Sequence, residues 1–94
     1  MSPPVFTDLR LLLENESFPQ TYVHKFIGLQ TETFLHAVQA LIAEFSGAKL
    51  IVSFRESKKK DYIAYTFSWE AISPDEIIQL IEKTGKLPDL KMIL

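Results

Sequence analysis

Four stretches of the chain alternate apolar residues with polar or smaller ones. They are residues 21–29, 48–56, 62–71 and 87–94. A period of two places successive side chains on opposite faces of a β-strand, so the pattern predicts four strands. The short polar segment Ser57–Asp61 is too brief for a helix and predicts a hairpin between the second and third strands.

Two other stretches repeat their apolar residues every three or four positions, as a helix does. In the first, Thr31 to Ser46, Thr31 is expected to cap the helix and Gly47 to end it in a left-handed conformation. The second begins at Ser73-Pro74-Asp75-Glu76, where we expect the serine hydroxyl to cap an amide and Glu76 to reach back to the cap. Gly85 is expected to end this helix.

The elements follow one another as strand, helix, strand, strand, helix, strand. With right-handed crossovers this order predicts an α+β fold, a ferredoxin-like βαββαβ sandwich with a four-stranded antiparallel sheet in order 4-1-3-2. Both helices then share one face of the sheet. We expect residues 1–94 to form a single domain, in which residues 1–17 are an N-terminal extension with a short helix carrying Phe6, Leu9, Leu12 and Leu13.

Alternation along the strands also predicts which side chains the two helices cover. The bulkier set is expected beneath the helices: Tyr22, Phe26, Leu50, Val52, Phe54, Ile63, Tyr65, Phe67, Trp69, Leu90, Met92 and Leu94. The other set is expected on the outer face: Val23, Lys25, Ile27, Ile51, Ser53, Arg55, Tyr62, Ala64, Thr66, Ser68, Lys91 and Ile93. Two readings of that face stay open. Either the short N-terminal helix folds back over it and hides Leu9, Leu12 and Leu13, or the face meets a partner.

Composition narrows the classes of function. The 94 residues include no cysteine, which excludes disulfides, thiol catalysis and iron–sulfur clusters. A formal net charge of -2 gives no electrostatic reason to expect tight binding to nucleic acid. We find neither a secretory signal nor an apolar run of about 20 residues, and therefore expect a soluble, cytoplasmic protein.

We recognise no group of catalytic or metal-binding residues in the sequence. His24 and His36 stand without a second ligand at a metal-binding spacing, so we expect no metal and no cofactor. An acylphosphatase-like reaction needs an arginine after the first strand and an asparagine on a strand, whereas the arginines are Arg10 and Arg55 and the asparagine is Asn15. We therefore expect a protein that is not an enzyme.

The chain resembles the YbeD-like family of small bacterial proteins of unknown function. The resemblance is carried by the order and spacing of Leu9–Glu14, Phe18-Pro19, Lys25–Gly28, the polar turn before Tyr62, and Lys91–Leu94. It implies a ferredoxin-like fold similar to the ligand-sensing regulatory domains called ACT. It therefore implies regulation or binding, without naming a ligand.

Taken together, these features predict a non-catalytic regulatory or protein-binding module, with a homodimer as one of its forms. We expect contact through the outer sheet face and the edge of the second strand, which has neither a proline nor a bulge signal. One alternative is a metabolite sensor with a small-molecule ligand near Gly28–Thr31, and another is a weak RNA-binding protein using Tyr62 and Lys58–Lys60. The candidate contact residues are Lys25, Ile27, Gly28, Ile51, Arg55, Tyr62, Lys91 and Ile93.

Overall fold

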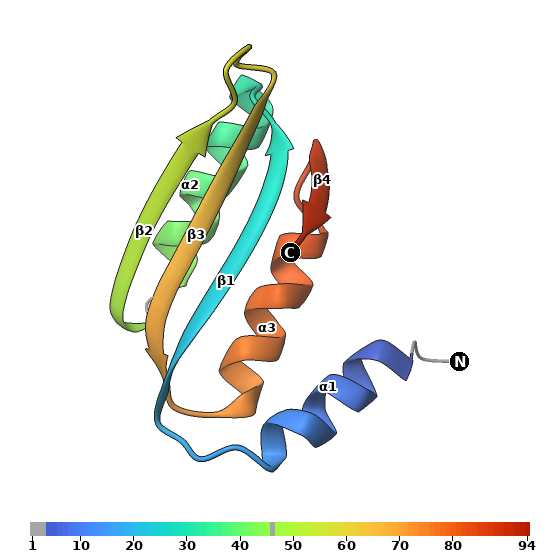
Figure 1. The fold of residues 1–94 in the computed structure, drawn as a ribbon, viewed down its shortest axis with the longest axis vertical. Helices are drawn as coiled ribbons and strands as arrows, with labels where there is room; N and C mark the ends of the chain where they lie inside the picture. The colour runs from blue at the N-terminus through green and yellow to red at the C-terminus, as the bar shows by residue number, and fades with distance from the viewer. Residues whose placement is uncertain (1–3, 46) are drawn as a thin grey trace.

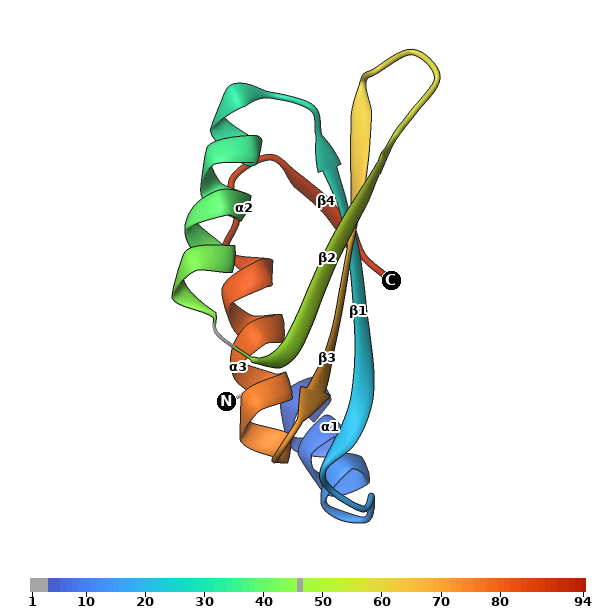
Figure 2. The ribbon, with the colours of Figure 1, turned by 90° about the vertical axis from the view of Figure 1, so that its left-hand side faces the viewer.

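A four-stranded antiparallel sheet, covered on one face by two helices, forms the body of the protein (Figures 1 and 2). A computed structural model describes the backbone of residues 4–45 and 47–94, and side chains from residue 9 onwards. The strands are β1 (Gln20–Leu29), β2 (Ala48–Glu56), β3 (Tyr62–Ala71) and β4 (Leu90–Ile93), in the order β2-β3-β1-β4. The covering helices are α2 (Glu32–Glu44) and α3 (Pro74–Gly85). The predicted topology and sheet order are confirmed.

Aromatic rings fill the space between the sheet and the helices. The Phe26 ring stacks on Tyr65 with centroids 5.6 Å apart and meets the rings of Phe34 and Phe67 edge-on at 6.2 and 5.5 Å. Trp69 is also almost fully buried, at 1% exposure. Offset and edge-on contacts add to the free energy gained by burying large apolar area. These contacts tie β1 and β3 to α2 and confirm the predicted inner faces of both central strands.

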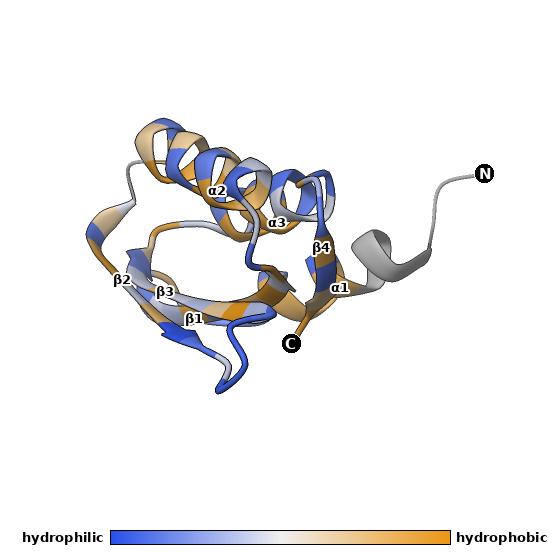
Figure 3. Cartoon of the chain, turned by 90° about the horizontal axis from the view of Figure 1, so that it is seen from above, coloured by the Kyte–Doolittle hydropathy of each residue, from blue (hydrophilic) through white to orange (hydrophobic). Residues whose placement is uncertain are grey.

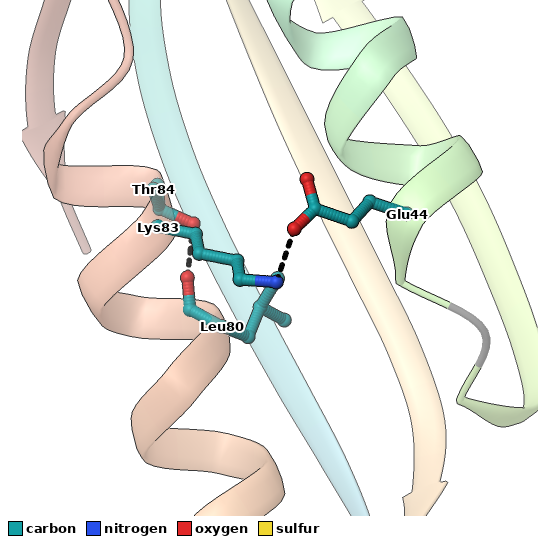
Figure 4. Close-up of polar contacts among 4 residues, drawn as sticks. All are labelled: Glu44, Leu80, Lys83 and Thr84. Atoms are coloured by element: carbon teal, nitrogen blue, oxygen red, sulfur yellow. Dashed lines mark hydrogen bonds and ion pairs between the residues drawn. The ribbon is translucent and has the colours of Figure 1, made fainter.

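The two helices are also joined at their outer surface. The Lys83 ammonium on α3 contacts the Glu44 carboxylate on α2, and both side chains remain partly exposed (Figure 4). Exposed ion pairs contribute about 1 kcal/mol or less, because solvent screens them. Hydrophobic packing therefore determines how the two helices sit side by side above the sheet (Figure 3).

One of the two predicted helix caps is present. The Phe34 N–H donates to Thr31 Oγ1 at 3.1 Å, as expected of an N-cap. Ser73 occupies the N-cap position of α3 but makes no side-chain cap bond. Glu76 instead accepts a hydrogen bond from the Trp69 indole Nε1 at 2.6 Å. The predicted capping box is wrong, because the buried indole donor requires an acceptor and Glu76 is placed to supply it.

Gly47 follows α2 without the left-handed conformation expected of it, and Gly85 ends α3. No glycine in the described parts of the chain has a positive φ. At Gly47, a Cβ would lie 2.7 Å from Cδ1 of Trp69, so close packing explains this glycine. Gly85 is the last residue of α3, and Lys86 follows it as the cap. The predicted left-handed stop at Gly47 is wrong, whereas the prediction that Gly85 ends its helix is confirmed.

Gly28 lies inside β1, whereas the sequence predicts that it ends the strand. A Cβ at this position would overlap the ring of Phe34, which lies against the Gly28 Cα. The β1–β4 pairing shifts register between Ile27 and Gly28, which marks a bulge. The prediction that Gly28 ends the strand is therefore wrong, and Gly28 is required because only hydrogen leaves room for the Phe34 ring.

The N-terminal helix α1 (Pro4–Glu14) lies beside α3 at one end of the sheet (Figure 1). Its Leu13 is only 6% exposed and joins the core, with Leu9 packed against it. Leu12 remains 68% exposed. The helix itself is confirmed, but the reading in which it folds back over the outer sheet face is wrong, because its buried leucines reach the core from the end of the sheet. The prediction for Phe6 concerns a side chain outside the described ones.

The contact between Gly28 and Phe34 predicts opposite effects for two similar substitutions. We expect Gly28→Ala to lower the free energy of unfolding by about 2 kcal/mol, because the new methyl group displaces the Phe34 ring from a packed core. Gly85→Ala is the matched control. Its Cβ would meet nothing within 4 Å, and we expect it to raise the free energy of unfolding by about 0.5 kcal/mol. Urea unfolding of both variants checks this; equal effects would contradict it.

Candidate functional site

The face of the sheet opposite α2 and α3 is the candidate functional surface. Within residues 4–45 and 47–94, no helix or strand packs over it (Figures 2 and 3). Large apolar side chains are nevertheless exposed there: Val23 at 50%, Ile51 at 67% and Met92 at 51%. Single exposed apolar residues are ordinary on a protein surface, whereas several on one open sheet face indicate a contact surface.

Two neighbouring hollows lie on this face near the β2–β3 hairpin. One, of about 210 Å³, is lined by Ile27, Arg55, Glu56, Ser57, Tyr62 and Ala64. The other, of about 460 Å³, is lined by Ile27, Tyr62, Lys91 and Met92. Because they share Ile27 and Tyr62, we treat them as one depression and call it the outer hollow. It crosses all four strands, and its floor is mainly apolar.

Three cations surround the outer hollow or lie next to it. Arg55 and Lys91 line it, and Lys25 lies two residues before Ile27 on the same face of β1. None of the three takes part in an ion pair within the described part of the chain. Glu56 is the one carboxylate among the lining residues. This part of the surface is therefore locally positive, although the whole chain carries a formal net charge of -2.

Six of the eight predicted contact residues lie on the outer face. Ile27, Arg55, Tyr62 and Lys91 line the outer hollow. Lys25 and Ile51 share the face, since they pair with Thr66 and Ser68 of β3. Gly28 is buried under the Phe34 ring and offers no surface. The eighth residue, Ile93, lies on the other face.

The bulge between Ile27 and Gly28 explains the wrong faces predicted for β4. Ile93 pairs with Phe26 and so belongs to the helix-covered side, while Met92 pairs with Ile27 on the outer side. Met92 and Leu94, predicted to lie beneath the helices, are 51% and 66% exposed. Met92 is the site residue that the sequence analysis missed. No local signal reveals it, because the shift arises from pairing with a distant strand.

The edge strand β2 departs from prediction in two respects. Its pairing with β3 shifts register between Ala48 and Ile51, and Lys49 has a φ of 57°, so the edge contains a bulge where none was predicted. Pairing is regular from Ile51 to Glu56. Phe54, predicted to be covered, is 62% exposed, because an edge strand has a neighbour on one side only; its ring centroid lies 6.0 Å from that of Tyr65.

The loop proposed to bind a metabolite already uses its donors within the chain. The Leu29 N–H donates to the Asp89 carbonyl and the Gln30 N–H to the Asp61 carbonyl, both at 2.9 Å. The Thr31 hydroxyl donates to the Asp89 carboxylate at 2.6 Å. Few backbone donors remain for a ligand, so the prediction of a site at Gly28–Thr31 gains no support from these contacts.

His24 is a core residue. Its Nε2 lies 3.0 Å from Thr84 Oγ1, and the Thr84 hydroxyl donates to the Leu80 carbonyl at 2.7 Å (Figure 4). Since the single hydroxyl hydrogen is already used, Thr84 accepts from a protonated Nε2 of a neutral imidazole. Burial lowers the pKa of His24 to about 4, because desolvation disfavours the charged form. Among the described residues, no three His, Asp or Glu side chains gather as a metal site.

This arrangement of an antiparallel sheet beneath two helices defines the chain as a ferredoxin-like α+β protein. The chain belongs to the family described as "Protein of unknown function (DUF493)", whose model matches residues 14–94. The resemblance to YbeD-like proteins is thereby confirmed. Protein HP0495 from H. pylori has a similar solution structure, with a TM-score of 0.60 and 16% sequence identity, over 85% of this chain and 86% of that one. At this identity the likeness shows the fold alone.

A search of the curated proteins finds no match to the sequence of this chain. Of the helices described between residues 4 and 94, none is long and apolar enough to cross a membrane. The residues of the outer hollow therefore have to be interpreted from their own chemistry.

The buried histidine predicts a specific dependence of stability on pH. Between pH about 6.5 and about 4, the unfolded chain binds a proton at His24 that the folded chain does not. The free energy of unfolding should therefore fall as the pH drops through this window, by up to about 3 kcal/mol. The His24→Gln variant should lose this pH-dependent fall in the free energy of unfolding. The control variant His36→Gln, at an exposed position, should retain it. Urea unfolding at several pH values measures the slopes, and equal slopes in wild type and His24→Gln would refute the assignment.

Proposed function

We propose that this chain is a cytoplasmic, non-catalytic regulatory or protein-binding module whose partner lies on the outer sheet face and the adjoining edge of β2. One observation carries the proposal: an apolar depression around Ile27 and Tyr62 is flanked by Lys25, Arg55 and Lys91, three cations that form no ion pair with the described residues. An apolar centre with a charged rim is the usual composition of a protein contact surface.

The edge of β2 extends this surface. Ile51 on the outer face is 67% exposed, and Phe54 on the helix side is 62% exposed. The strand between them pairs regularly with β3, while its other side has no neighbouring strand. An extended segment of a partner can add to such an edge through backbone hydrogen bonds and place its side chains against both residues.

The chemistry of the outer hollow favours binding over catalysis. Neither a histidine nor a cysteine is among the residues that line it. The serine hydroxyl there, Ser57 Oγ, accepts hydrogen bonds from the amides of Asp61 and Tyr62 at 3.1 Å and so serves the hairpin turn. A nucleophile requires a base within hydrogen-bond reach, and Ser57 has a structural role instead.

Protein binding is also favoured over binding of RNA. RNA-recognition domains of this topology stack two or three bases on aromatic residues of the central strands. Here Tyr62 is the aromatic residue that lines the outer hollow, and its neighbours are Ile27 and Ala64. Lys58–Lys60 is exposed at the hairpin tip, which is an ordinary position for solvated charges.

Affinity capture with matched variants tests the proposal. We expect Ile51→Asp and Arg55→Glu each to reduce recovery of the partner by at least about tenfold, because they place charge in an apolar contact or reverse a rim charge. Lys86→Glu makes the same charge change as Arg55→Glu but lies at the end of α3. This variant should bind the partner as wild type does. Equal capture by all the variants would remove the outer face as the contact surface.

A further inference from the structure

The last turn of α1 and the residues directly after it expose both apolar and acidic side chains. Leu11 and Leu12 are 57% and 68% exposed, and Glu14 and Glu16 are exposed beside them in the sequence. Leu11 and Glu14 are three residues apart and therefore share a face of the helix. With Leu13 buried in the core, this surface points away from the body of the protein. We call Leu11, Leu12, Glu14 and Glu16 the α1 patch.

The α1 patch is held in place on the fold. Leu13 anchors the helix in the core, and Arg10 Nη2 lies 2.6 Å from Asp75 Oδ1 at the start of α3. The family match begins at residue 14, so nearly all of this helix precedes the part of the chain that the family model covers.

The outer hollow is complementary to the α1 patch in both polarity and charge. Its apolar residues Ile27, Tyr62 and Met92 lie close to the cations Lys25, Arg55 and Lys91, for which the described part of the chain supplies no ion-pair partner. A leucine pair entering the hollow would bring its two flanking glutamates towards these cations. One chain thus carries an apolar acidic projection and an apolar basic depression.

A chain cannot bring its own α1 patch to its own outer hollow. The segment after α1 leads within a few residues into β1, at the end of the sheet remote from the β2–β3 hairpin (Figure 1). The outer hollow lies near that hairpin, because Tyr62 is the first residue of β3. The two surfaces are therefore at opposite ends of the molecule, whose longest dimension is 41 Å.

We propose that the outer hollow binds the α1 patch of a second copy of this chain, reciprocally, in an antiparallel dimer. The inference rests on the proposed function, for which it names the partner. When two outer faces meet about a two-fold axis across the long direction, the α1 end of each copy lies beside the hairpin end of the other. Both contacts then form at once, which closes the dimer and prevents open-ended growth.

Electrostatics gives this dimer a distinctive dependence on solution conditions. The glutamates and the cations are exposed, so their attraction is screened by salt. The dissociation constant should therefore rise as salt is added. A dimer formed through backbone pairing at the β2 edge alone would respond much less.

Complementary charge reversal tests the proposal by sedimentation of the full chain over a range of concentrations. One variant carries Glu14→Lys and Glu16→Lys, and the other carries Arg55→Glu and Lys91→Glu. Each alone should dimerise at least about tenfold more weakly than wild type, because like charges face one another in both contacts. An equimolar mixture should recover wild-type affinity to within about threefold, since both contacts of the mixed dimer are again of opposite charge.

A control variant carrying Glu82→Lys and Lys86→Glu reverses one acidic and one basic charge at exposed positions on α3 and at its C-cap, and it should dimerise as wild type does. Circular dichroism verifies that each variant is folded. A wild-type chain that stays monomeric at all concentrations, or single variants that dimerise as wild type does, would overturn the dimer. So would a mixture that fails to recover.

Capture of another protein that still depends on Ile51 and Arg55 would then show that the proposed function survives without this dimer. Loss of both dependences would remove the proposed function as well.

Discussion

The contact between the Phe34 ring and the Gly28 backbone sets the architecture of this protein. It places the Phe34 ring, in the first turn of α2, directly against the backbone of the central strand β1, where a Cβ would overlap it. The same ring meets Phe26 and Tyr65 edge-on, so helix and sheet share one aromatic cluster. Because α3 packs on the same side of the sheet as α2, the bulky residues of the strands lie on that face. The opposite face carries smaller side chains of mixed polarity.

Much of this fold could be predicted because its signals are local. The bounds of β2 and β3 were predicted to the residue, since alternation and the polar turn between them are readable within a short window. The face assignments of β4 could not be predicted in the same way. A bulge opposite Ile27 and Gly28 moves its alternation by one position, and this shift depends on a strand more than sixty residues away.

Strand alternation predicts those parts of the candidate site in which the strands pair without a bulge. Lys25, Arg55 and Tyr62 share a face as expected, whereas Met92 was assigned to the wrong one. Rules for capping failed where a tertiary partner competed: Glu76 follows a serine at the spacing of a capping box, yet it binds the Trp69 indole. A buried donor without an acceptor costs more than an open helix end that water can solvate.

The bulge near Lys49 limits what the exposed edge can accept. An incoming strand finds evenly placed backbone groups from Ile51 to Glu56, then reaches a residue whose left-handed backbone turns the chain out of register. The bulge therefore limits regular pairing along this edge to the stretch from Ile51 to Glu56. The bulge thus protects the exposed edge of this sheet against the continued addition of strands that builds fibres. A proline or an inward-pointing charge usually provides this protection.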